Sequence, residues 1–161
     1  MRTFVTIFTV VVHLVLLDEI AKEVAAATLN GSAAVSVIPG LFNLAYVENR
    51  GCAWGLFQGH VWPLAAFAII AFAALVWKRV SVFGLAEKGW RLWSGRIAEC
   101  LLYAGIIGNL IDRVYRGYVI DFLDFYWRNS HFPCFNLADA FISVAAGLLV
   151  VTSFFTRKTE K

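Results

Sequence analysis

Charged residues are scarce in this sequence. Of its 161 residues, 16% are Asp, Glu, Lys or Arg and 60% are apolar. A soluble domain usually carries about a quarter charged residues, and disordered, collagen-like or coiled-coil chains depart from that composition in other directions. The apolar residues also fall in long uninterrupted runs. The composition therefore excludes an ordinary soluble domain and indicates a chain embedded in a membrane.

Motifs for metals, cofactors and nucleophilic catalysis are missing too. The three cysteines and three histidines form no CxxC or Cys/His spacing, so we expect neither a metal site nor a cofactor. No serine lies in a GxSxG elbow, and there is no glycine-rich phosphate loop. Cys52 and Cys134 are candidates for a disulfide in an oxidising compartment, but we favour free thiols.

Four apolar segments are long enough to cross a bilayer, which takes about 20 helical residues. They are residues 4–27, 61–77, 97–114 and 138–156. The third contains Glu99, which we expect to pair with Arg96 one turn earlier. A cleavable signal peptide is an alternative for the first segment, because Ala25 to Ala27 resemble a cleavage site. The charges between Asp18 and Glu23 separate those alanines from the apolar core and favour a retained helix.

The basic residues predict an orientation for these segments. Nine of the 14 cations precede the first segment, follow the fourth, or lie between the second and third. Cytoplasmic loops carry an excess of Lys and Arg, so we expect both termini in the cytoplasm. Residues 28–60 and 115–137 then form two outer loops. The net charge of +3 is a topology signal, and no nucleic-acid partner is predicted.

The two outer loops contain segments typical of β-strands. Ala34 to Ile38 and Phe42 to Val47 are β-prone and flank the turn dipeptide Pro39-Gly40, while Tyr118 to Trp127 is rich in aromatic and β-branched residues. No repeat or linker divides the chain. The predicted fold is therefore an all-α integral membrane protein of four transmembrane helices with a small extracytoplasmic β-sheet, forming one domain over residues 1–161.

Polar residues gather at the predicted outer ends of the apolar segments, a costly position that usually marks function. They are Asp18, Lys22, Asn109, Asp112, Arg113, Asp121, Asp124, Asn136 and Asp139. Simpler roles are open for several. The pairs Asp18–Lys22 and Asn109–Arg113 have helical ion-pair or hydrogen-bond spacing. Asp139 follows Asn136 by three residues at a helix start, where it can act as a cap. Asp112 and Asp124 are interpreted as solvated charges.

Asp121 and Asp139 come from separate segments, and both have apolar neighbours. If they meet, repulsion in a poorly hydrated pocket lets only one ionise near neutrality, so that the pair shares a proton. One carboxylate then activates water while the other, protonated, polarises a carbonyl. This pattern predicts peptide hydrolysis without a metal or a nucleophilic side chain.

Five segments in order resemble the bacterial lipoprotein signal peptidase (signal peptidase II) family. They are DEIAK (18–22), ENRGCAWGLF (48–57), GIIGNLIDR (105–113), VIDF (119–122) and FNLADAFI (135–142). The resemblance implies a membrane aspartic endopeptidase that cleaves diacylglyceryl-modified prolipoproteins on the amino side of the lipidated cysteine. It also implies a multi-pass protein of the bacterial inner membrane with an extracytoplasmic active site.

The resemblance further implies roles for individual residues. Asp121 and Asp139 would form the catalytic dyad. The matching positions that line the site or bind substrate are Asn109, Arg113, Asn136, Asn49, Gly51, Asp18 and Lys22. Membrane lipids and prolipoproteins are the implied partners, with inhibition by cyclic peptide antibiotics such as globomycin and a monomeric state. The chain departs from the family pattern at Glu19, Ala104 and Trp54-Gly55, none of them in the dyad.

Two other functional classes fit the apolar segments. A small proton-coupled transporter or channel subunit also needs intramembrane acids, but here the acids cluster at one interface and form no chain across the bilayer. A non-enzymatic membrane scaffold would explain the helices without the two aspartates. Replacing Asp121 or Asp139 by Asn discriminates among the three, because only the peptidase loses proteolysis while keeping its fold.

Overall fold

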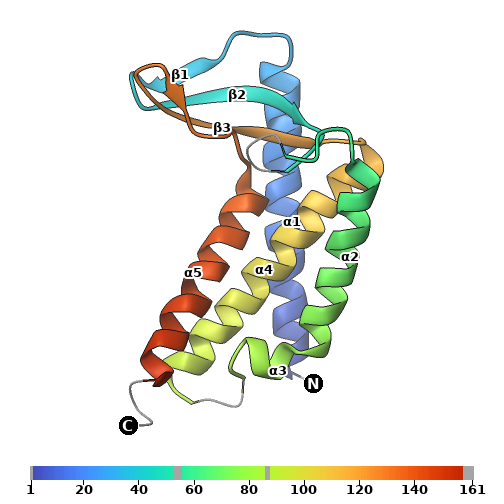
Figure 1. Cartoon of the computed structure of the whole chain (residues 1–161), viewed down its shortest axis with the longest axis vertical. Coiled ribbons are helices and arrows are strands. Elements are labelled where there is room, and N and C mark those ends of the chain that lie inside the picture. Colours follow the sequence, from blue (N-terminus) through green and yellow to red (C-terminus); the bar gives the residue numbers. More distant parts are fainter. Residues whose placement is uncertain (1, 53–55, 86–87, 158–161) are drawn as a thin grey trace.

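A computed structural model describes residues 2–52, 56–85 and 88–157. Long helices lie side by side, and a small sheet covers one end of them (Figure 1). We call this the sheet end of the bundle; α1 begins and α5 ends at the opposite end. The departure from the family pattern at Trp54-Gly55 and the terminal cations Lys158 and Lys161 lie outside the described residues.

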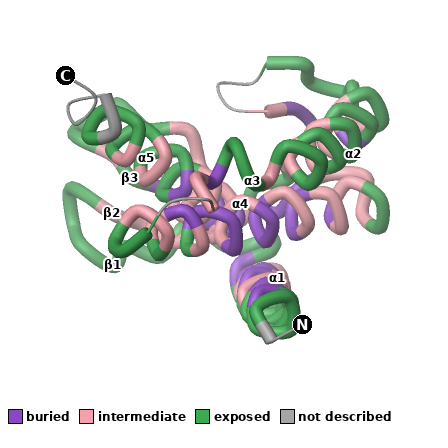
Figure 2. Tube along the Cα trace, turned by 90° about the horizontal axis from the view of Figure 1, so that it is seen from below, coloured by how far each residue is buried: buried purple, intermediate pink, exposed green. Residues whose placement is uncertain are grey.

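The helices match the four apolar segments closely. Their bounds are α1 Arg2–Leu29, α2 Val61–Trp77, α3 Arg79–Val82, α4 Trp90–Tyr115 and α5 Leu137–Arg157. The short α3 directly follows α2, and α4 begins seven residues before the segment expected at 97–114. Helix α4 is central, because it contacts α1, α2 and α5 (Figure 2).

Small residues bring α4 close to its neighbours. A Cβ added at Gly105 would lie 2.4 Å from the Ala138 carbonyl oxygen of α5, which is closer than such contacts allow. One added at Gly108 would lie 2.5 Å from Oδ2 of Asp18 in α1. Ala104 and Ala138 are fully buried beside these glycines. Close approach over small residues is typical of helices that pack within membranes.

The bundle has an apolar surface and charged residues inside it. Phe67 on α2 and Phe154 on α5 are about 70% exposed, while Asp18, Lys22 and Asp112 are fully buried. Among the described residues, α1 (Thr3–Leu29) and α5 (Leu137–Phe155) are long and apolar enough to cross a membrane, and α2 is a shorter apolar helix. This distribution is that of a protein whose surroundings are hydrocarbon.

The sheet confirms the β-prone segments of the sequence. It has four antiparallel strands in the order β1 (Val35–Ile38), β2 (Phe42–Asn49), β3 (Val119–Trp127) and β4 (Ser130–His131). The Pro39-Gly40 turn joins β1 to β2, with Gly40 at a φ of +81° that favours glycine. In the β2–β3 register Asn49 faces Val119, which brings the end of β2 beside the start of β3.

Three sequence-based expectations about charges are wrong. Glu99 pairs with Arg79, with a shortest N–O distance of 2.7 Å, and not with Arg96. The Arg96 guanidinium instead lies over the Trp93 ring. Asp112 and Asp124 are buried rather than solvated. Helix packing decides the first two cases, because it brings the end of α2 and α3 against the side of α4 and turns Asp112 into the bundle. Asp124 lies in β3, where its carboxylate contacts Asn43 and His131.

Candidate active site

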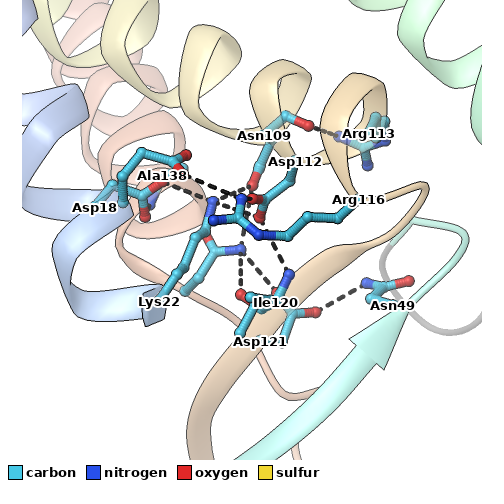
Figure 3. Close-up of polar contacts among 12 residues, drawn as sticks. Asp18, Lys22, Asn49, Asn109, Asp112, Arg113, Arg116, Ile120, Asp121 and Ala138 are labelled. Carbon is cyan, nitrogen blue, oxygen red and sulfur yellow. Dashed lines mark hydrogen bonds and ion pairs between the residues drawn. The ribbon is translucent and has the colours of Figure 1, made fainter. Parts of the chain in front are cut away.

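Most of the polar residues singled out in the sequence meet at the sheet end of the bundle (Figure 3). Helix α1 contributes Asp18 and Lys22, α4 contributes Asn109, strand β3 contributes Asp121 and the start of α5 contributes Asp139. Hydrogen bonds and ion pairs connect them into one network within a largely buried site.

The start of α5 is a reciprocal cap. Asn136 precedes the first residue of the helix, and its Oδ1 accepts the backbone N–H of Asp139 at 3.0 Å. Oδ2 of Asp139 accepts the backbone N–H of Asn136 at 3.4 Å. The capping role considered from the sequence is therefore real. The cap uses only one oxygen of Asp139, because Oδ1 accepts a hydrogen bond from the side chain of Asn109.

Asp121 is held in β3 by two asparagine side chains. Asn49 at the end of β2 donates to its Oδ2 at 2.9 Å, and Asn136 donates to its Oδ1 at 2.8 Å. The side chain is almost completely buried. Burial and, to a smaller extent, the nearby negative charge of Asp139 together raise the pKa of Asp121 to about 7, against the two amide donors that lower it.

Asn109 connects the two aspartates to the helix core. Its Nδ2 donates to Oδ1 of Asp139 at 2.7 Å, and its Oδ1 accepts a hydrogen bond from Nδ2 of Asn136 at 3.1 Å. Because Asn136 also donates to Asp121, the chain Asp139–Asn109–Asn136–Asp121 runs through side-chain hydrogen bonds. The two acids thus belong to one hydrogen-bonded unit.

A buried charge cluster, made up of Asp18, Lys22, Asp112 and Arg116, lies behind this unit. Lys22 forms ion pairs with Asp18 at 2.6 Å and with Asp112 at 2.9 Å. Oδ1 of Asp18 accepts the backbone N–H of Ala138 at 2.9 Å. An acid on α1 therefore binds a free N–H at the start of α5, where the helix dipole favours negative charge.

Arg116 is the member of this cluster that sequence reasoning missed. It forms ion pairs with Asp112 and with Glu19 and Glu23 of α1. Asp112 also accepts the backbone N–H of Ile120 at 3.1 Å, which ties the residue before Asp121 to α4. The four-residue spacing between Asp112 and Arg116 was the available signal.

Arg113 and Gly51 meet at one side of the site. Arg113 donates to the Gly51 carbonyl oxygen at 3.2 Å, and the Gly51 N–H donates to Oδ1 of Asn49 at 2.9 Å. A Cβ at Gly51 would lie 2.5 Å from the backbone oxygen of Leu56, so this position needs glycine. The contact orients Asn49, whose Nδ2 then points to Asp121.

A cavity of about 500 Å³ opens beside Asp139. Its polar lining comes from Asn49, Asn109, Arg113, Asp139 and Ser143, while most of the remaining wall is apolar. Asp139 thus faces the cavity, whereas Asp121 lies behind Asn49 and Asn136. Asp18 and Lys22 are fully buried and do not line it, so their placement differs from the lining role that the resemblance implied.

Cys134 also lines the cavity but is poorly suited to nucleophilic attack. Burial and, to a smaller extent, the nearby charge of Asp121 together raise the pKa of its thiol to about 12. The reactive thiolate is therefore scarce at neutral pH. The expectation of free thiols is confirmed for Cys52 and Cys134, and Cys100 is free as well. The carboxylates remain the groups suited to acid–base chemistry.

The apolar surface, the interior polar network and a cavity beside two interacting acids define a membrane-embedded enzyme of the hydrolase class. A family model described as signal peptidase (SPase) II matches residues 10–155. The chain belongs to the signal peptidase II family.

Relatives and solved structures agree with that assignment. A lipoprotein signal peptidase of Shewanella pealeana is 40% identical over 159 residues, covering 96% of this chain and 89% of the relative. One of Fusobacterium nucleatum is 38% identical over 149 residues, covering 90% and 84%. A bacterial membrane enzyme structure superposes with a TM-score of 0.80 at 28% identity, covering 97% of this chain and 92% of that one.

Proposed function

We propose that this signal peptidase II removes the signal peptide from diacylglyceryl-modified prolipoproteins, on the amino side of the lipidated cysteine, with Asp121 and Asp139 as its catalytic dyad. The observation that carries the proposal is the hydrogen-bonded unit that joins both acids beside a cavity. The names of the relatives, lipoprotein signal peptidases, support the substrate class.

The chemistry follows from the different surroundings of the two acids. Asp139 faces the cavity and would act as the base that takes a proton from water. Asp121, with a pKa of about 7, would hold the shared proton and give it to the scissile carbonyl oxygen as the hydroxide adds to the carbon. Collapse of this tetrahedral intermediate then breaks the C–N bond: the leaving amine takes the proton held by Asp139, and one hydroxyl of the intermediate returns its proton to Asp121 as the carboxyl product forms.

The remaining site residues divide into two groups in this proposal. Asn49, Asn109, Arg113 and Asn136 provide amide and guanidinium donors at or next to the cavity, and Gly51 fixes Asn49. Asp18 and Lys22 act from behind, through the start of α5 and through Asn109. Signal peptide, acyl chains and antibiotics such as globomycin would occupy the apolar part of the cavity, whose walls include Phe135 and Ile142.

We propose a four-span topology for the single domain formed by residues 1–161. Helices α1, α2, α4 and α5 would cross the bacterial inner membrane, with both termini in the cytoplasm and the sheet outside. The bias of Lys and Arg supports this orientation. The scissile bond of a lipidated precursor lies where its signal helix leaves the bilayer, which is the depth of the sheet end. We propose that a monomer surrounded by lipid performs the reaction.

A gel-shift assay tests the proposal. Purified protein in detergent is incubated with a diacylglyceryl-modified prolipoprotein and, separately, with its unlipidated precursor. Cleavage of the lipidated form alone, and its loss in Asp139→Asn, is the expected result. The matched control is Asp124→Asn, which changes another buried acid of the same strand as Asp121 but one outside the dyad. Cleavage that survives in Asp139→Asn would rule out the dyad.

A further inference from the structure

We propose that Lys22 is a positioning residue: its buried ammonium fixes the direction of the Asn109 side-chain amide, so that Nδ2 and not Oδ1 meets Asp139. This inference rests on the proposed function, in which Asp139 is the catalytic base. It gives Lys22 a role that differs from lining the site, because the side chain is fully buried and does not reach the cavity.

The Lys22 ammonium has three oxygen neighbours, two in ion pairs and one in a hydrogen bond. Two acceptors are the Asp18 and Asp112 carboxylates, at 2.6 and 2.9 Å. The third is Oδ1 of Asn109, at 3.3 Å. The carboxylates offset the charge of the ammonium, whose burial would otherwise be costly. They also hold the ammonium in place, since Asp18 is bonded to the start of α5 and Asp112 to the backbone of Ile120.

A carboxamide has nearly the same shape when it is turned over, so its partners decide its direction. Oδ1 of Asn109 accepts from Lys22 and from Nδ2 of Asn136, while its Nδ2 donates to Oδ1 of Asp139 at 2.7 Å. The reversed amide would place two N–H groups against the ammonium and an oxygen against the carboxylate. Both contacts would then be repulsive.

Asn136 alone does not impose this direction. Its Nδ2 also has the carbonyl oxygen of Ile120 at 3.2 Å and Oδ1 of Asp121 at 2.8 Å as acceptors. It would therefore remain hydrogen-bonded if Asn109 turned over. For Lys22 the reversed amide would instead place N–H groups against a buried positive charge whose other two partners are the Asp18 and Asp112 carboxylates. The Asp139 carboxylate and the Lys22 ammonium therefore both favour the observed orientation of Asn109, and Lys22 is the charged group outside the dyad that does so.

The proposal predicts a specific pattern of kinetic coupling. Lys22→Met should lower kcat on the lipidated precursor about 10- to 100-fold while KM changes less than about two-fold, because the cavity wall is unchanged and only the base is misplaced. In an Asn109→Ala background the same substitution should have little further effect, since the amide through which Lys22 acts is gone. The matched control is Glu23→Gln, which removes an exposed partner of Arg116 and leaves Asn109 untouched.

Additive losses in the double variant, or a Lys22→Met effect confined to KM, would overturn the proposal. Because Lys22→Met leaves two carboxylates with one partner fewer, the pair Asp18→Asn/Lys22→Met serves as a second variant that removes opposite charges together. It should fold and show the same loss of kcat. Wild-type kcat in that variant would be equally decisive against the proposal.

A spectroscopic measurement separates this inference from the proposed function. In protein labelled with ¹⁵N-asparagine, the Asn109 side-chain amide should give one NMR signal pair in the wild type and in Glu23→Gln, and a shifted or doubled pair in Lys22→Met. An unchanged signal in Lys22→Met would refute the positioning role, whether or not the enzyme cleaves. A wild-type protein that fails to cleave lipidated precursor would refute only the proposed function.

Discussion

The bundle carries buried charge in two places that are organised differently. At the sheet end, Lys22 has three partners, and Asp112 has three as well: Lys22 on α1, Ile120 on β3 and Arg116 just after α4. About 20 Å away along α4, Glu99 is paired with Arg79 alone and has one carboxylate oxygen without a hydrogen bond among the described residues. The charges at the sheet end can orient other polar side chains, whereas the Arg79–Glu99 pair can only join two helices.

This difference indicates what each region does. A buried ion pair contributes little net stability, because desolvation offsets attraction, but it is costly to break one-sidedly. The Arg79–Glu99 pair therefore links the end of α2 and α3 to α4. At the sheet end the charges continue into the amides of Asn109 and Asn136, which touch the two aspartates. Substitutions at the sheet end should therefore lower the rate of cleavage, whereas substitutions in the Arg79–Glu99 pair should lower the free energy of unfolding.

The largest effect is expected for Asp121→Asn. The amide cannot supply the shared proton of the dyad, so cleavage of lipidated precursor should fall about 1,000-fold or more. Folding should survive, because Asn nearly preserves the shape of the side chain and keeps one oxygen that can accept a hydrogen bond from Asn49 or Asn136. Initial rates, together with the melting temperature in detergent, measure both quantities. Activity within ten-fold of the wild type would contradict the dyad.

The next largest effect concerns stability at the opposite end. Arg79→Met leaves the fully buried Glu99 carboxylate unpaired and should lower the free energy of unfolding by about 3 kcal/mol. The value of kcat should stay within about two-fold, because the active site is far away. Thermal unfolding in detergent measures the first quantity and the gel-shift assay the second. The double variant Arg79→Met/Glu99→Leu, which removes both charges, should recover most of the stability; a low melting temperature there would argue against the pair as the cause.

The third effect is a dependence of the cleavage rate on pH, which we expect to come from the acids at the sheet end. With the pKa of Asp121 raised to about 7, the rate should fall about ten-fold per pH unit once the shared proton is lost above that value. It should also fall in acid, when the pair takes up its second proton. Asp124→Asn should keep this bell shape. A rate that is flat from about pH 4 to about pH 9 in folded protein would count against a proton-sharing pair.

The same shift has a consequence for stability with a definite sign. The carboxyl of Asp121 has a higher pKa in the folded protein than its ordinary 3.8, so between about pH 4 and pH 7 the folded state binds more protons than the unfolded state. Its contribution to stability is therefore fully present below about pH 4 and declines as the pH rises to about 7. Melting temperatures of the wild type and Asp121→Asn across this window measure it, and an identical slope in the two proteins would contradict the raised pKa.

Much of this architecture is predictable from local sequence. Runs of apolar residues give the helices, β-prone residues around Pro39-Gly40 give the first hairpin, and Asp121 and Asp139 stand out as acids with apolar neighbours. Local sequence does not predict which residues pair with one another when they come from distant parts of the chain. Arg96 has the right spacing for Glu99, but packing brings Arg79 there instead, and burial of Asp112 depends on which face of α4 meets α1.

The smallest effect is expected for His131→Asn. This variant tests whether the burial of a polar pair or the distance between its atoms decides how much the pair stabilises the fold. His131 is 2.8 Å from Asp124, almost the separation of Arg79 and Glu99, but its side chain is 54% exposed. Solvent weakens such pairs, so the loss of stability should be under about 1 kcal/mol with kcat unchanged. Thermal unfolding and initial rates at neutral pH measure these quantities. A loss as large as that of Arg79→Met would mean that distance, and not burial, decides how strongly these pairs hold the fold.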